Sequence, residues 1–156
     1  MNDLAHTYRN QGQLSEAEQL QVKALERRKA RLGEDHPDTL TSMNNLAGTY
    51  WNQGRWSEAE QLQVKVLKRR KARLGEDHPD TLTSMNNLAL IYGNQGQWPE
   101  AEQLQVKVLE KSKARVGEDH PDTLTSMNNL AQTYGKRASG QKLSSCSSKN
   151  WRHGKS

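Results

Sequence analysis

A period of 42 residues runs through most of the chain and restricts its possible folds more than any other feature. The segment GEDHPDTLTSMNNLA occurs three times, beginning at Gly33, Gly75 and Gly117. The four tyrosines keep the same step: Tyr8, Tyr50, Tyr92 and Tyr134. Units of this kind cannot bury an apolar face alone and are stable only when they stack on neighbours. The chain is therefore expected to form an array of stacked units.

Each unit has the pattern of two helices, and no stretch shows the alternation typical of a strand. In the second copy the first helix is predicted over residues 37–52, where apolar side chains recur at i, i+3, i+4 and i+7. They are Leu40, Met43, Leu46, Ala47 and Tyr50. The helix is expected to begin at Pro37 and to end at a turn in which Gly54 is left-handed.

The second helix of this unit is predicted over residues 56–74 and ends before another glycine. Ser57 is expected to cap its N-terminus, with Glu60 three residues further on completing a capping box. Its predicted apolar stripe consists of Ala59, Leu62, Val66, Leu67 and Leu74. Trp56 stands between the two helices and is expected to lie in the core, as is Trp98 in the next copy.

The apolar content is low for a folded chain, and the repeat explains why. Only 32% of the residues are hydrophobic and 26% are charged, which by composition is typical of disorder. A thin solenoid needs only a narrow apolar stripe on each helix, because neighbouring hairpins share one core. No run of residues is apolar enough to span a membrane. The single cysteine, Cys146, excludes an intramolecular disulfide framework, so a reducing, cytoplasmic location is expected.

The net charge of +5 would suit a nucleic-acid-binding protein, but it arises from the last 21 residues. Residues 136–156 contain six basic and no acidic residues, and the remainder has 17 basic and 18 acidic ones. The Lys/Arg clusters towards the ends of the second helices are interpreted as a solvated convex face that suits the helix dipole. We therefore expect no nucleic-acid partner and no membrane partner.

The residues of the unit resemble a known repeat family. The following fall at the signature spacing of a tetratricopeptide repeat: Asn45, Leu46, Ala47, Tyr50, Gln53, Gly54, Trp56, Glu58, Ala59, Val66 and Leu67. The usual period is about 34 residues. The longer unit, with HPDTLTSMNNLA and EAEQL, resembles kinesin light chain repeats, and more closely those of fungal proteins described as kinesin light chains. The resemblance covers residues 1–135 and implies an all-α, right-handed superhelical solenoid of antiparallel helix pairs.

In this family the first helices line a concave peptide-binding groove, which implies a set of groove residues here. The candidates are Asn2, His6, Arg9, Asn10, Thr41, Asn44, Trp51, Asn52, Thr83, Asn86, Leu90, Asn94, Thr125, Asn128 and Gln132. An asparagine amide both donates and accepts, so a ladder of them suits an extended peptide backbone. Alternatively, these asparagines are solvated or bond to the next repeat. Because Arg9 is the only basic candidate, an acidic peptide is not obviously favoured.

The repeats divide the chain into five segments. Residues 1–33 form an N-terminally truncated first repeat, because Met1 is in register with Met43 inside a first helix, and further sequence is expected upstream. Residues 34–75 and 76–117 are complete repeats, and residues 118–135 are the first helix of a fourth. Residues 136–156 are rich in Ser, Lys and Arg and are predicted to be a disordered tail.

The tail also has an explanation at the level of the gene. Residues 138–146 can be encoded by GCC AGT GGC CAG AAG CTG AGC AGC TGC, which read from the third base gives QWPEAEQL, the sequence of residues 97–104. We hypothesise that the tail is an out-of-frame reading of a fourth second helix, which the nucleotide sequence tests. Without that helix, the preceding one exposes Leu124, Met127, Leu130 and Tyr134 and offers a surface for self-association.

No catalytic, metal or cofactor site is expected. Asp35, His36 and Asp38, which recur in the next two copies, have ligand chemistry but serve equally well as helix caps. No nucleophile elbow and no Gly-rich phosphate loop is present. Trp51 is a ligand candidate because glycine replaces it in the two later copies.

The expected function is a protein–protein interaction scaffold that binds a peptide or partner domain, as a kinesin light chain-like adaptor. The alternatives are a sensor array from a nucleotide-binding switch protein of the NB-ARC type and a non-functional gene fragment.

Overall fold

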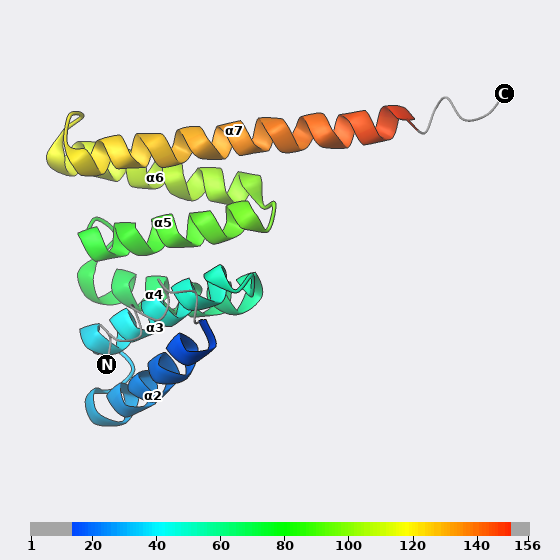
Figure 1. Ribbon diagram of the computed structural model, residues 1–156. Helices are drawn as coiled ribbons and strands as arrows, with labels where there is room; N and C mark the ends of the chain where they lie inside the picture. Colours follow the sequence, from blue (N-terminus) through cyan, green and yellow to red (C-terminus); the bar gives the residue numbers. More distant parts are fainter. Residues whose placement is uncertain (1–13, 151–156) are drawn as a thin grey trace.

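The computed structural model describes the backbone of residues 14–150 and the side chains of residues 14–139. This part of the chain forms six helices (Figure 1). They are α2 (Leu14–Leu32), α3 (Pro37–Asn52), α4 (Trp56–Leu74), α5 (Pro79–Asn94), α6 (Trp98–Val116) and α7 (Pro121–Asn150). The bounds of α3 and α4 coincide with those predicted from the periodicity.

The helices stack in chain order, each packed against the one before and the one after (Figure 1). Consecutive helices run in opposite directions, and α7 extends well past the end of the stack. The first helices of the units are α3, α5 and α7, and the second helices are α2, α4 and α6. This arrangement is the predicted all-α solenoid of antiparallel helix pairs.

Each first helix begins in the same way, at a histidine followed by a proline. The backbone N–H of Asp38 donates to Nδ1 of His36 across 3.2 Å, and the other two copies repeat the bond at the same distance. The DHPD segment is therefore a cap, as one reading of the sequence held, although the acceptor is the imidazole nitrogen and not a carboxylate oxygen. Thr39 Oγ1 adds a 2.8 Å bond to the Gly33 carbonyl, which ties the connector to the helix.

The predicted capping box at the start of the second helix is wrong. The N-cap of α4 is Arg55, whose side chain makes no capping bond. The backbone N–H of Ala59 bonds the Arg55 carbonyl at 3.1 Å, which places Ser57 inside the first turn. An N-cap side chain accepts from the backbone N–H two or three residues further on. For Ser57 the first of these is the N–H of Ala59, which is already bonded to the Arg55 carbonyl.

The core is the apolar stripe that the periodicity predicts. Leu40, Met43, Leu46 and Val66 are buried in one cluster with Leu25 of the preceding helix. A second cluster contains the equivalent residues of the next repeat, Leu82, Met85 and Val108. Neighbouring hairpins therefore share their apolar surface, which is what allows so apolar-poor a chain to fold.

Two apolar residues predicted to be buried lie at the surface. Leu74 is 41% exposed; it is the last residue of α4 and lies at the edge of a small hollow beside Pro37 and Leu40. Trp56 is 39% exposed at the opposite end of the same helix, while its counterpart Trp98 is half-buried. Helix ends in a solenoid have neighbours on fewer sides than helix centres, so periodicity overstates their burial.

The expectation of a disordered tail from residue 136 is wrong as far as residue 150. The structure continues α7 to Asn150, through a stretch that contains no proline. Residues 151–156 of the predicted tail lie outside the described residues. The exposure of the helix is confirmed for Leu124, Met127 and Tyr134, while Leu130 is half-buried. None of the described helices is long and apolar enough to cross a membrane.

Candidate functional site

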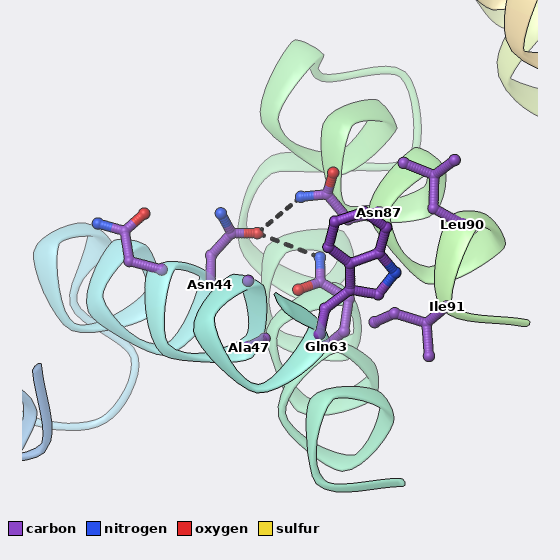
Figure 2. A pocket seen from close by; sticks show the side chains of 9 residues that line it. Asn44, Ala47, Gln63, Asn87, Leu90 and Ile91 are labelled. Carbon is purple, nitrogen blue, oxygen red and sulfur yellow. Dashed lines mark hydrogen bonds between the residues drawn. The ribbon is translucent and has the colours of Figure 1, made fainter. Parts of the chain in front are cut away.

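Most of the predicted groove residues of α3, α5 and α7 border hollows on these helices. One hollow lies between α3, α4 and α5 and has a volume of about 250 Å³. Figure 2 shows it from close by. Its lining consists of Asn44, Asn45, Ala47, Gly48, Trp51, Gln63, Asn87, Leu90 and Ile91. We call it the Trp51 cavity.

A hydrogen-bond network fixes Asn44 at one wall of the Trp51 cavity. Its Oδ1 accepts from Gln63 Nε2 at 3.2 Å and from Asn87 Nδ2 at 2.9 Å (Figure 2). Gln63 is only 1% exposed and also donates to the Ser84 carbonyl at 3.2 Å. The carbonyl end of the Asn44 amide is thus occupied by two donors, and its N–H₂ end remains as a donor for a ligand.

Two large apolar side chains give the Trp51 cavity its binding surface. Trp51 and Leu90 come from neighbouring units, and each is 39% exposed. No charged side chain belongs to the lining among the described residues. Apolar walls with a few fixed polar groups are the usual composition of a ligand site. The cavity is therefore suited to an uncharged, partly apolar segment.

The other candidates lie apart from the Trp51 cavity. Thr83, Asn86 and Thr125 line a second hollow between α5, α6 and α7, which Leu90 also borders. Thr41 lines a much smaller one beside Arg70. Thr125 and Asn128 flank a shallow depression on α7. None of the hollows found in the described part of the chain is lined by Asn52, Asn94 or Gln132. Asn2, His6, Arg9 and Asn10 lie outside the described residues.

Sequence reasoning missed the second asparagine of each Asn-Asn pair and the buried glutamine behind it. Asn87 is both a donor to Asn44 and a wall of the cavity, and Gln63 is its floor. The signal was available, because both residue types recur at the 42-residue step. It was overlooked because a polar residue on the packing side of a helix has no place in an apolar stripe.

Charged residues elsewhere on the solenoid pair with one another, both between and within units. Arg55 binds Glu18 at 2.9 Å and lies 4.2 Å from the centre of the Tyr50 ring. Hydrogen bonds from Gln53 and then from Arg55 hold the pKa of the Glu18 carboxyl below its ordinary value, against the opposing effect of desolvation. Arg69, from a predicted solvated basic cluster, pairs with Asp35 at 2.9 Å. Among the described residues, no three His, Cys, Asp or Glu side chains converge as metal ligands would.

These features define a class of protein, a solenoid of stacked helical hairpins with hollows between successive units. Such solenoids provide extended surfaces for protein–protein interaction. The tetratricopeptide repeat family profile matches residues 1–72, 43–114 and 87–141. The chain belongs to the tetratricopeptide repeat family and is an interaction scaffold of that family.

Solved structures agree with this assignment. A Podosopora anserina protein described as a kinesin light chain, with nearly identical repeats, is 30% identical and superposes with a TM-score of 0.81. The match covers 90% of this chain and 67% of that one. A single-substitution variant of that protein matches at 30% identity and a TM-score of 0.78, over 92% and 68% of the two chains.

A third solved structure, of BtubC (BKLC) from P. vanneervenii, has the same fold. It matches with a TM-score of 0.78 over 97% of this chain and 60% of its own, at 23% identity. An identity this low supports the fold alone. Comparison with curated proteins finds no match.

Proposed function

We propose that the chain binds an extended peptide segment of a partner protein along the faces of α3, α5 and α7, with the Trp51 cavity as the main recognition site. The observation that carries the proposal is the pairing of a fixed amide with two exposed apolar side chains in one hollow. Asn44 is oriented by two hydrogen bonds, and Trp51 and Leu90 stand beside it.

The chemistry of the cavity selects the kind of peptide. An oriented side-chain amide can donate to a peptide carbonyl, and the exposed indole and leucine can receive an apolar side chain two residues away along an extended strand. Because Asn44 is held in place by Asn87 and Gln63 before any ligand arrives, less conformational entropy is lost on binding. An uncharged lining favours an apolar anchor residue over an acidic one.

The kinesin light chain description of the neighbours at 30% identity supports a more specific role. We infer that the array acts as an adaptor. It would bind a peptide segment of one partner protein, while other parts of the chain or of its assembly bind a second partner. The candidates on α5 and α7, among them Asn86 and Asn128, would then extend the contact with the peptide beyond the first cavity.

The test is a selection of peptides from a displayed random library against the full chain, followed by calorimetric titration of the selected peptides. Trp51→Gly restores the residue that occupies this register position in the next two copies, and Leu90→Ala shortens the opposite wall. Val64→Ala is the matched control, because Val64 is similarly exposed, at 41%, and lines none of the hollows described.

We expect Trp51→Gly and Leu90→Ala each to weaken binding by about tenfold or more, since a buried apolar anchor contributes about 1.5–3 kcal/mol. Val64→Ala should leave the dissociation constant unchanged. Selected peptides that bind equally well to all three variants would show that recognition takes place elsewhere, and the proposal would then be wrong.

A further inference from the structure

A single difference between the repeats changes one of the inter-unit contacts. Position 28 of the first unit is arginine, and so is position 70 of the second, but position 112 of the third is serine. All three positions are 42 residues apart and lie on the second helix of their unit, facing the helix that follows.

In the first two copies the arginine enters a fixed polar receptor. Arg70 is 8% exposed, and its Nη1 donates to the Asp80 carbonyl at 3.0 Å and to Ser84 Oγ at 2.9 Å. Arg28 contacts the equivalent carbonyl of Asp38 and the hydroxyl of Ser42. The receptor therefore consists of a main-chain carbonyl in the first turn of a first helix and a serine hydroxyl one turn later.

The third copy keeps the receptor but has no arginine to fill it. Ser126 is 3% exposed, and its Oγ donates to the Asp122 carbonyl at 2.8 Å, as Ser84 does to Asp80 at 3.0 Å. The hydroxyl and the carbonyl receive no guanidinium from the described part of the chain. Serine at position 112 lacks the stem and the guanidinium, and it is 2% exposed and lines a hollow together with Ser126.

The volumes of the two sites agree with this comparison. The hollow around Arg70 measures about 40 Å³, and the one that includes Ser112 measures about 320 Å³. Part of the larger volume lies beside Asn86, Asn87, Leu90 and Asn129, the register counterparts of residues that line the Trp51 cavity. Six of the seven residues that line the smaller hollow have their register counterpart in the larger one: Pro79, Leu82, Thr83, Ser112, Arg115 and Asp122. The larger hollow therefore contains the register position of the smaller one, without an arginine side chain, and continues into the counterpart of the Trp51 cavity. We call the larger one the Ser112 cavity.

The Ser112 cavity opens on the face proposed to bind the peptide. Thr83, Asn86 and Thr125, which are groove candidates, belong to its lining, and it shares Leu90 with the Trp51 cavity. Arg115 lies at its rim and is paired with the Asp122 carboxylate at 3.4 Å, so the local charge is balanced. The Oδ1 atom of Asn86 is buried and has no partner among the described residues.

We propose that the Ser112 cavity receives an arginine side chain of the bound peptide, which takes the place of the internal arginine of the other two copies. The apolar stem would pack on Leu82 and Val108, as the stem of a partly buried arginine does. The guanidinium would donate to the Asp122 carbonyl and Ser126 Oγ in its planar fork geometry. This proposal depends on the proposed function in one respect, namely that the arginine belongs to a bound peptide. The arginine site itself is argued from the comparison of the three copies.

A probe smaller than a peptide tests the cavity directly. The full chain is titrated with N-acetyl-arginine amide, and the backbone amide signals of Ser126 and Asn129 are followed by NMR. N-acetyl-citrulline amide, which has the same shape without the charge, is the comparison ligand. We expect saturable shifts with the arginine probe, with a dissociation constant on the order of 1–10 mM, and at least about tenfold weaker binding of citrulline.

Two variants test whether an internal arginine and the ligand occupy the same site. One variant adds an arginine at the Ser112 cavity, and the other removes the arginine from the equivalent site of the preceding unit. Ser112→Arg should fill the cavity from within and abolish the shifts, as Arg70 does in its own copy. Arg70→Ser should open a second cavity and add shifts at Ser84. Circular dichroism and thermal unfolding check that each variant folds. No saturable shift at Ser126, equal binding of citrulline, or unchanged binding to Ser112→Arg would each overturn the proposal.

The outcome is separable from that of the proposed function. If the arginine probe binds while the selected peptides ignore Trp51, the Ser112 cavity stands and the Trp51 cavity does not. If peptides depend on Trp51 but the arginine probe produces no shifts, the reverse holds.

Discussion

Replacement of Gln63 by leucine is expected to destabilise the solenoid, whereas the same replacement of Gln105 is not. Both side chains are 1% exposed, and both stand in the same position of an identical EAEQLQVK segment. Gln63 donates to Asn44 Oδ1 and to the Ser84 carbonyl, each at 3.2 Å. The amide of Gln105 makes no hydrogen bond within the described residues.

The magnitude follows from the difference between the two sites. A hydrogen bond contributes about 1 kcal/mol net, so Gln63→Leu removes about 2 kcal/mol in its two bonds. Gln105→Leu removes a buried amide without partners, whose desolvation costs free energy, and is expected to be neutral or stabilising. Leucine adds the same apolar surface in both variants, so the difference in their unfolding free energies isolates the hydrogen bonds.

The measurement is equilibrium urea unfolding of the full chain and both variants, followed by circular dichroism, with thermal unfolding as a second readout. For a chain of this size, about 2 kcal/mol corresponds to a difference in Tm of about 4–8 °C. If both variants lose the same stability, or if Gln105→Leu is the less stable of the two, the hydrogen bonds of Gln63 do not have the role assigned to them.

Three further predictions concern backbone, charge and surface. Gly75→Ala should lower the free energy of unfolding by about 1–3 kcal/mol, because φ is 86° and ψ 169° at this position. Gly93 lies within a helix, so Gly93→Ala should raise the free energy of unfolding by about 0.5–1 kcal/mol. Urea unfolding measures both, and equal effects of the two substitutions would contradict this. Because its pKa is lowered on folding, Glu18 stabilises the fold above its ordinary pKa of 4.5, and this is lost as the pH falls below that value. The stability difference between the unmodified chain and Glu18→Gln should therefore shrink in acid, and a constant difference would refute the linkage. Leu124 is 51% exposed on α7, so Leu124→Glu should reduce any self-association seen by sedimentation, and unchanged sedimentation would place the contact elsewhere.

The helices, their bounds and most of the core follow from the sequence because they depend on local spacing. The apolar stripe of α3 and the proline and glycine at its ends specify where that helix begins and ends. The failures occur where local spacing is not the deciding factor. Ser57 resembles a cap but lies inside the helix, and Leu74 resembles a core residue but is 41% exposed at the end of its helix.

The candidate site was only partly predictable. Asn44, Trp51 and Leu90 were selected from the face of the first helix, and the structure brings all three to one cavity. Asn87 and Gln63 were not selected, because their part depends on how one unit is placed against the next. A contact between units depends on the distance and angle of stacking, which no single segment of sequence contains.

The three glutamines of the second helices separate what sequence determines from what tertiary structure decides. Identical EAEQLQVK segments determined that Gln21, Gln63 and Gln105 occupy equivalent, buried positions. Their partners differ: Gln21 accepts from Thr49 Oγ1 at 2.8 Å, Gln63 donates to Asn44, and Gln105 bonds to neither equivalent. Local sequence specifies the helix and its buried face, since these depend on neighbours within a turn or two. A buried amide, however, bonds to whatever the adjacent units bring within about 3 Å, and only their packing determines that.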